Sequence, residues 1–182
     1  MAKQTLTQAV SRSGALVGLM ILLEALDLLF HLGLDRFGIV PRTLHGLVGV
    51  GLSPLLHAGA PHLFANAAPL FFLLSALFLN PRYRPMQTLC AIWIASGLGT
   101  WLIGRGGAVH IGASSLIYGL AVYLICAGWW VRSWTTAFIS LAVVVVYGGI
   151  FYGVLPQSGR VSWEGHLAGA VAGWWVARRN LA

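Results

Sequence analysis

The sequence predicts an all-α, polytopic membrane protein built as a bundle of six transmembrane helices. Of its 182 residues, 58% are hydrophobic and only 8% are charged, and the mean hydropathy is +0.82. Soluble domains carry charges on about a quarter of their residues, so this composition excludes an ordinary soluble fold. Apolar stretches recur from near residue 14 to residue 177 and leave little room for a separate soluble domain. We therefore expect residues 1–182 to form a single membrane-embedded domain.

Six apolar segments come near the length of a membrane crossing. A spanning helix needs about 20 mostly apolar residues, because each adds about 1.5 Å across a hydrocarbon core about 30 Å thick. Proline and glycine mark the joins between the segments, as at Asn80-Pro81 and Gly106-Gly107. The last segment is short, and a locally thinned bilayer would accommodate it. The segments are predicted at roughly 14–33, 58–79, 86–104, 111–131, 134–154 and 163–177.

The basic residues of the chain indicate its orientation in the membrane. The formal net charge is +7, but the lysines and arginines are scattered between apolar runs and form no patch for nucleic acid. Seven of the 11 fall on the side of the predicted bundle that carries both termini. Cytoplasmic loops collect such residues, so we expect both termini in the cytoplasm. The small size of the chain, without an appended domain or transit-like leader, favours a bacterial plasma membrane. Residues 34–57 then form a long external loop, a length that is often functional.

Five polar side chains from three predicted helices share one depth, just below the external surface. Ser114 and His166 lie just inside the external ends of the fourth and sixth helices. His57 and His62 flank the external start of the second helix, and Asn66 lies one turn below His62. Ionisable residues at membrane depth are functional candidates, because burying them there is expensive. The convergence of these five residues indicates a functional site.

The residue types of this cluster suit acyl transfer. A serine hydroxyl is a weak nucleophile until a base takes its proton, and histidine is the usual base, so we predict that Ser114 and His166 react as a pair. The tetrahedral intermediate needs hydrogen-bond donors for its oxyanion, which Asn66, His62 and the backbone N–H of Ser114 can supply. Tyr118 lies one helical turn from Ser114, where its ring is expected to pack against His166.

The sixth predicted helix favours a dyad that lies in a close contact between two helices. Glu164 is the nearest acidic residue, but the helical period turns it about 200° away from His166, so we expect no third catalytic member. Gly165, Gly169 and Gly173 form a stripe of small residues on this helix. Such stripes let helices approach closely, which would bring the fourth and sixth helices within hydrogen-bonding distance.

Three motifs in this region together resemble the signature of rhomboid intramembrane serine proteases. Residues 57–66 read HxxxxHxxxN, residues 112–115 read GxSx, and residues 166–173 read HxxGxxxG. They occur in that order on the second, fourth and sixth predicted helices. Each motif alone is weakly specific, but the three at matching helix positions are strongly so. The resemblance spans about residues 45–177.

This resemblance implies a six-helix bundle whose active site opens to water from the outer side. It implies an intramembrane serine protease that hydrolyses a peptide bond in or near the transmembrane segment of membrane-protein substrates, without a metal or organic cofactor. Ser114 would be the nucleophile and His166 the general base. His62 and Asn66 would support the oxyanion, and Tyr118 would stack on His166.

The family pattern also assigns a role to Gly112 and shows two departures in this chain. By the resemblance, Gly112 would allow close approach of the backbone beneath the site. The position after the serine is often glycine in the family, but here it is Ser115, which could compete as nucleophile or perturb the oxyanion pocket. The Trp-Arg pair common in the first external loop is absent, and residues 46–51 read GLVGVG instead.

Two functions from other classes remain as alternatives. A catalytically inactive rhomboid-like protein would bind transmembrane segments, but it would have no need of both Ser114 and His166. A small transporter would use polar residues in the first helix, but the chain lacks the internal repeat and the paired broken helices expected of one.

Further polar residues lie outside this cluster. Glu24, Asp27 and His31 lie at i, i+3 and i+7 on one face of the first predicted helix and are expected to face the bundle. Their types allow a metal or proton site, but hydrogen bonding to neighbouring helices is favoured, and no metal site is predicted. His45 and His110 are expected to be solvated in external loops.

Overall fold

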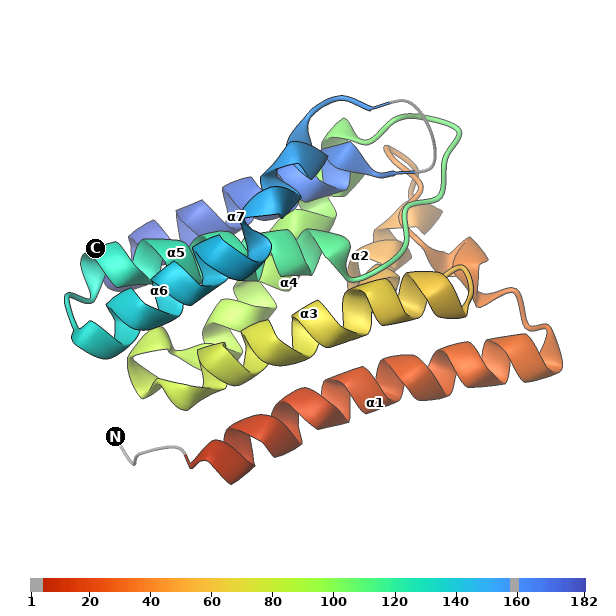
Figure 1. Ribbon diagram of the computed structural model, residues 1–182. Helices are drawn as coiled ribbons and strands as arrows, with labels where there is room; N and C mark the ends of the chain where they lie inside the picture. The colour runs from red at the N-terminus through yellow and green to blue at the C-terminus, as the bar shows by residue number, and fades with distance from the viewer. Residues whose placement is uncertain (1–4, 158–160) are drawn as a thin grey trace.

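The computed structural model describes residues 5–157 and 161–182, and in these ranges the fold is helical (Figure 1). One short antiparallel bridge joins Ile39 to His110. The prediction of an all-α fold is therefore confirmed for the described residues. The longer helices are α1 (Leu6–Phe30), α3 (Ala60–Leu79), α4 (Pro85–Ile103), α5 (Ser114–Trp130), α6 (Trp134–Tyr147) and α7 (Trp163–Leu181). The shorter elements are η1 (Leu34–Phe37), η2 (His45–Leu47), α2 (Val48–Leu52), η3 (Ser53–Leu55), η4 (Pro81–Tyr83) and η5 (Gly148–Val154).

Each predicted segment has a helix, but the bounds of the first and last were wrong. Helix α1 begins at Leu6 rather than near residue 14, because Thr5 and Gln8 form a capping box that starts the helix in a polar stretch. It ends at Phe30, where His31 adopts a left-handed conformation. Helix α7 continues to Leu181 instead of stopping near residue 177. Hydropathy located the apolar part of each helix, whereas capping and helix propensity decide where the helix ends.

The fifth predicted segment, 134–154, is not one continuous α-helix. Helix α6 ends at Tyr147, and residues 148–154 form the 3₁₀ segment η5. The change coincides with the pair Gly148-Gly149, and glycine is the least favourable helix residue after proline. This change of winding places the backbone of Gly153 beside α7, where it contributes to the site described below.

Three helical stretches are long and apolar enough to cross a membrane by length and composition. These are Leu6–Phe30, Ala60–Leu79 and Pro81–Ile103, among the described residues. Helices α5 and α6 are apolar but shorter, with 17 and 14 residues. Helix length alone therefore supports three crossings rather than the six that were predicted.

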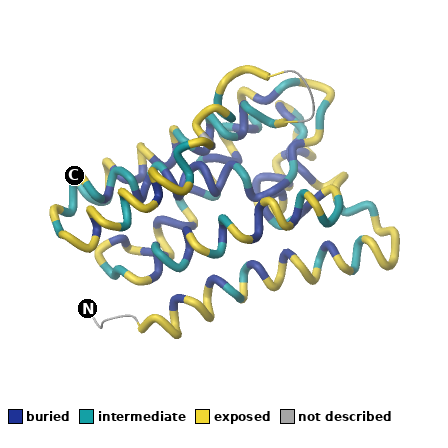
Figure 2. The backbone as a smooth tube through the Cα atoms, viewed as in Figure 1, coloured by how far each residue is buried: buried dark blue, intermediate teal, exposed yellow. Residues whose placement is uncertain are grey.

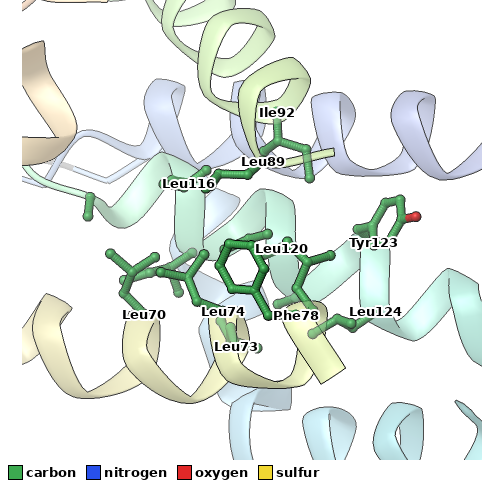
Figure 3. Packing of buried hydrophobic residues seen from close by; sticks show 14 of the residues in the cluster. Leu70, Leu73, Leu74, Phe78, Leu89, Ile92, Leu116, Leu120, Tyr123 and Leu124 are labelled. Carbon is green, nitrogen blue, oxygen red and sulfur yellow. The ribbon is translucent and has the colours of Figure 1, made fainter. Parts of the chain in front are cut away.

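Helix α5 lies at the centre of the bundle. Figure 2 shows it as the most continuously buried helix, whereas α1 is exposed along most of its length and packs chiefly on α3. Leu70 and Leu74 of α3 belong to the same buried cluster as Leu116 and Leu120 of α5, and Figure 3 shows Leu116 beside Leu89 and Ile92 of α4. This packing fixes the start of α5, which carries Ser114, between its neighbours.

Glycines allow α5 and α7 to touch backbone to backbone. A Cβ atom on Gly169 would overlap the carbonyl oxygen of Ser115, and one on Gly173 would overlap that of Gly119. Gly165 differs, because a Cβ there would instead meet Ser162 at 2.9 Å and Thr100 of α4 at 3.4 Å. Two glycines of the stripe thus line the α5–α7 contact, which carries the candidate site at its end.

The polar face of α1 does not gather into one site. Glu24 is buried, at 4% exposed, and Asp27 is half-buried and accepts a hydrogen bond from the backbone N–H of Leu34. His31 is exposed, so the expectation that all three residues face the bundle was wrong for this residue, which lies where the helix ends. In the described parts of the chain, no group of three His, Cys, Asp or Glu residues is placed to hold a metal ion.

Candidate active site

Ser114 is the first residue of α5, directly after a turn that glycine makes possible. Gly112 has φ +100°, in the left-handed region that glycine tolerates, and its N–H donates to the carbonyl oxygen of Ser53 at 2.8 Å. The first N–H groups of a helix have no partner within the helix, and they carry the positive end of its dipole. The backbone N–H of Ser114 is therefore a donor suited to a developing negative charge.

The hydroxyl of Ser114 contacts the imidazole of His166, on α7. Its Oγ lies 3.0 Å from Nε2 of His166, and Nδ1 of the same ring lies 2.9 Å from the carbonyl oxygen of Gly153. Because a carbonyl oxygen only accepts, Nδ1 carries the proton and Nε2 has a free lone pair. The serine hydroxyl then donates to Nε2. This tautomer is the one that a general base requires.

The carbonyl of Gly153 is a part of the site that the sequence did not reveal. It takes the place that a carboxylate occupies in a catalytic triad, on the far side of the imidazole. Every residue has a carbonyl, so no residue type signals this role. The absence of a side chain at Gly153 is the one sequence feature linked to this role, because a Cβ there would overlap the hydroxyl of Tyr118 and lie 3.1 Å from Nδ1 of His166.

Tyr118 packs flat against the imidazole of His166. The ring centroids are 4.2 Å apart and the ring planes differ by 9°. Tyr118 is one turn along α5 from Ser114, so the same helix that carries the hydroxyl also holds the face of the base. With the Gly153 carbonyl at the ring edge, the orientation of His166 is fixed by contacts on two sides.

His62 and Asn66, both on α3, lie on the other side of Ser114. A Cβ on Gly112 would be 2.7 Å from Nε2 of His62, so the glycine allows this ring to approach the turn before Ser114. Nδ1 of His62 accepts a hydrogen bond from the backbone N–H of Ala58 at 3.3 Å, which leaves the proton on Nε2. Asn66 donates one amide hydrogen to the carbonyl oxygen of His62 at 2.8 Å and retains a second. Both side chains can therefore donate toward the site.

His57 is placed behind His62, away from the reacting atoms. It is 2% exposed, and its ring meets His62 edge-on with the centroids 5.1 Å apart. Burial, followed by the nearby His62, lowers the pKa of His57 to about 4. This imidazole is neutral near pH 7, and its contacts are those of a packing residue that supports His62.

His62, Asn66, Ser114, Tyr118 and His166 line a cavity of about 840 Å³, and His57 does not reach it. Of the two adjacent serines, Ser114 lines the cavity, whereas Ser115 is buried where its carbonyl meets Gly169 of α7. The volume falls within the range of about 300–1,000 Å³ that binding sites usually show. The cavity walls include Ser114, Tyr118, His166, His62, Asn66, Ala65, Pro69, Ile117, Tyr147 and His110.

His110 is buried, contrary to the expectation that it is solvated. It is 5% exposed, and its Nδ1 lies 2.5 Å from the hydroxyl of Ser162. Burial is the main cause that lowers the pKa of His110. The short bridge to Ile39 draws this part of the loop into the protein, which sequence periodicity did not indicate. His45, by contrast, is exposed, as predicted.

Glu164 lies apart from the two proposed reacting side chains. It is buried, and its carboxylate forms an ion pair with Arg105 at 3.6 Å. Nδ1 of His166 thus bonds to the backbone carbonyl of Gly153, whereas the carboxylate of Glu164 is paired with Arg105.

Comparison with known proteins agrees with the motifs. A family model described as the Rhomboid domain matches residues 42–181. Uncharacterised proteins of Mycobacterium bovis and Mycobacterium tuberculosis are each 46% identical over 165 residues, which cover 86% of this chain and 69% of theirs. A Mycobacterium leprae protein is 39% identical over 166 residues, covering 86% and 65%. No solved structure matches the chain. The chain therefore belongs to the rhomboid family of integral membrane proteins, which includes intramembrane serine proteases.

Proposed function

We propose that the protein is an intramembrane serine endopeptidase in which Ser114 is the nucleophile and His166 the general base. The observation that carries the proposal is the hydrogen bond between them, with Oγ and Nε2 3.0 Å apart and Nδ1 held by a carbonyl oxygen. A pair of residues that only packed two helices together would not need the tautomer that leaves Nε2 free to accept a proton.

The contacts suggest how each atom would act. Oγ of Ser114 attacks the scissile carbonyl carbon while its proton moves to Nε2 of His166, and the charged imidazole keeps its Nδ1 hydrogen bond to Gly153. The oxyanion accepts from the Ser114 N–H, with His62 and Asn66 as further donors, each worth on the order of 3 kcal/mol. His166 then protonates the leaving amine. Water hydrolyses the acyl-enzyme by the same proton transfers in reverse, which releases the acid and restores the serine.

We further propose six membrane crossings within one domain, residues 1–182. Figure 1 shows α4 inclined across the other five longer helices, which run roughly alongside one another, and it shows the start of α1 and the end of α7 at the same end of the bundle, as an even number of crossings requires. Helices α5 and α6 would be short crossings inside the bundle, which neighbouring helices and local thinning accommodate. The cytoplasmic side of a bacterial plasma membrane would then hold both termini, with Ser114 at the outer end.

The substrate class proposed is a membrane protein with a segment that can unwind. A peptide bond within a helix is shielded by its own hydrogen bonds, so a substrate has to present an extended stretch to Ser114. The cavity of about 840 Å³ has room for such a stretch and mixes apolar wall residues, such as Pro69 and Ile117, with the polar groups of the site. Local unwinding of the substrate would provide this extended stretch. A site near the outer membrane boundary would also admit the water that hydrolyses the acyl-enzyme.

A cleavage assay with paired serine variants tests the proposal. Purified protein is incubated with labelled single-pass membrane substrates, alongside Ser114→Ala, His166→Ala and Ser115→Ala. Ser115 is the matched control, because it is the adjacent serine, buried and away from the cavity. Cleavage by the parent and Ser115→Ala, and by neither of the other two, supports the dyad. Parental cleavage by Ser114→Ala contradicts it, and binding of substrate by all four proteins without cleavage favours an inactive binding protein.

A further inference from the structure

A second contact between a hydroxyl and an imidazole lies beside the proposed dyad. His110 is four residues before Ser114, and Ser162 is four residues before His166. Nδ1 of His110 lies 2.5 Å from Oγ of Ser162, and Nε2 lies 3.4 Å from the carbonyl oxygen of Arg105. Since that carbonyl accepts, the proton sits on Nε2, and Ser162 donates its hydroxyl hydrogen to Nδ1.

The hydroxyl of Ser162 is committed to this contact although its position would suit a helix cap. Ser162 is the N-cap residue of α7, but its side chain accepts no hydrogen bond from the first turn. Ser133 shows the ordinary behaviour, because its hydroxyl accepts from the N–H of Thr136 at the start of α6. The side chain of Ser162 thus joins α7 to another segment and leaves the helix end uncapped.

Both ends of the contact are anchored close to the dyad. The carbonyl oxygen of Ser162 accepts a hydrogen bond from the backbone N–H of His166 at 3.1 Å. On the other side, the backbone of His110 exchanges two hydrogen bonds with Ile39, at 2.8 and 2.9 Å. His110 leads through three residues into Ser114. A shift at either end of the contact would therefore reach one member of the dyad.

A second link joins the same two segments. The guanidinium of Arg105 pairs with the carboxylate of Glu164 at 3.6 Å and donates to the carbonyl oxygen of Val161. Glu164 is buried, so this ion pair is less screened by water than a surface pair. The loop before α5 and the start of α7 are thus held together by the hydrogen bond of His110 and by the two contacts of Arg105.

We propose that His110 and Ser162 are positioning residues, whose hydrogen bond sets the distance between Oγ of Ser114 and Nε2 of His166. This inference rests on the proposed function, because it assigns the pair a role in that reaction. Among the described residues, no hydrogen bond joins this pair to Oγ of Ser114 or Nε2 of His166. The hydrogen bond fixes the distance between α7 and the loop before α5. That distance in turn determines how close the side chains of Ser114 and His166 lie.

The test measures the reaction of the full-length protein with a fluorophosphonate, a probe that modifies activated serines. Ser162→Ala removes the hydrogen bond, and the labelling rate is expected to fall by between about tenfold and a hundredfold, the range expected for a misplaced catalytic group. With a cleavable substrate, kcat is expected to fall by a larger factor than KM rises, and some rise in KM is expected because both residues also line the cavity. Ser162→Thr keeps the hydroxyl and is expected to restore most of the rate.

Ser133→Ala is the matched control, because it removes a capping hydroxyl at the start of α6. It is expected to lower the temperature of thermal unfolding but leave the labelling rate unchanged. Ser162→Ala is also expected to lower the unfolding temperature, because it leaves Nδ1 of the buried His110 unpaired, but it alone is expected to lower the labelling rate of the folded protein. If Ser162→Ala does not fold, His110→Gln removes the same hydrogen bond from the other side, and its labelling rate is expected to fall in the same range. The double variant is expected to lose no more rate than the worse single variant, because both remove one interaction.

The outcomes separate this inference from the proposed function. A parent protein that neither labels nor cleaves would overturn both. A parent that labels at Ser114, together with folded Ser162→Ala and His110→Gln variants that label at the parental rate, would overturn the positioning role and leave the dyad intact. Independent, multiplying losses in the double variant would also overturn it.

Discussion

Replacement of Gly153 by alanine tests how the base is oriented. The added Cβ would overlap the hydroxyl of Tyr118, lie 3.0 Å from its Cζ atom and lie 3.1 Å from Nδ1 of His166. Tyr118 is buried and stacked on the imidazole, so it cannot move away without disturbing that ring. The backbone of η5 has to yield instead, and the carbonyl that holds Nδ1 moves with it.

The size of the effect follows from this displacement. Relieving the overlap requires a shift of roughly an ångström or more, and a misplacement of 1 Å costs about a hundredfold in rate. A hundredfold loss corresponds to about 2.7 kcal/mol of transition-state stabilisation, at about 1.36 kcal/mol for each factor of ten. We therefore expect kcat/KM of Gly153→Ala to fall by about two orders of magnitude, with the fold retained.

The neighbouring glycine provides the control. A Cβ on Gly149, in the same 3₁₀ segment, would meet no atom within 4 Å in the described part of the chain, so Gly149→Ala is expected to retain parental activity. The double variant Gly153→Ala/Tyr118→Phe removes the overlapping hydroxyl and is expected to recover part of the loss. Activity is measured as cleavage of a labelled membrane substrate, and folding as circular dichroism during heating. Parental activity in a folded Gly153→Ala variant would refute the role given to this carbonyl.

Three further outcomes follow from the structure. Gly112→Ala is expected to abolish cleavage, because φ is +100° and the new Cβ would lie 2.7 Å from Nε2 of His62; parental activity would contradict this. Gly169→Ala is expected to cost about 1–3 kcal/mol of stability in a denaturant titration, since its Cβ overlaps the carbonyl oxygen of Ser115; unchanged stability would contradict it. The folded-state pKa of His57, about 4, lies below its unfolded value of about 6.5, so unfolding takes up a proton between these values. Stability is therefore expected to fall by up to about 1.4 kcal/mol per pH unit from pH 6.5 toward 4, and less steeply in His57→Gln; equal slopes would contradict this.

The sequence predicted those residues of the candidate site whose side-chain type indicates their chemistry. A serine, a histidine and their helical spacing led to Ser114, His166 and Tyr118, and the structure brings these three together. Helical periodicity also predicted that Glu164 points away from His166, and its ion pair with Arg105 agrees with this prediction. Side-chain identity and a regular helical period were sufficient for these residues.

The remaining features depend on backbone geometry, which residue types do not specify. The carbonyl of Gly153 reaches His166 only because α6 gives way to a 3₁₀ segment, whereas a uniform helix was expected there. His110 was assigned to solvent because its loop shows no periodicity, but pairing with Ile39 draws it inside. The start of α1 was missed for a related reason, since a capping box rather than apolarity defines it.

The site of covalent labelling tests the central claim most directly. The purified protein is treated with a fluorophosphonate, digested and mapped by mass spectrometry. A single adduct on Ser114, absent from His166→Ala and retained in Ser115→Ala, is the predicted result. Cleavage of substrate by protein that carries its adduct on another residue, or none at all, would contradict the assignment of Ser114 as the nucleophile.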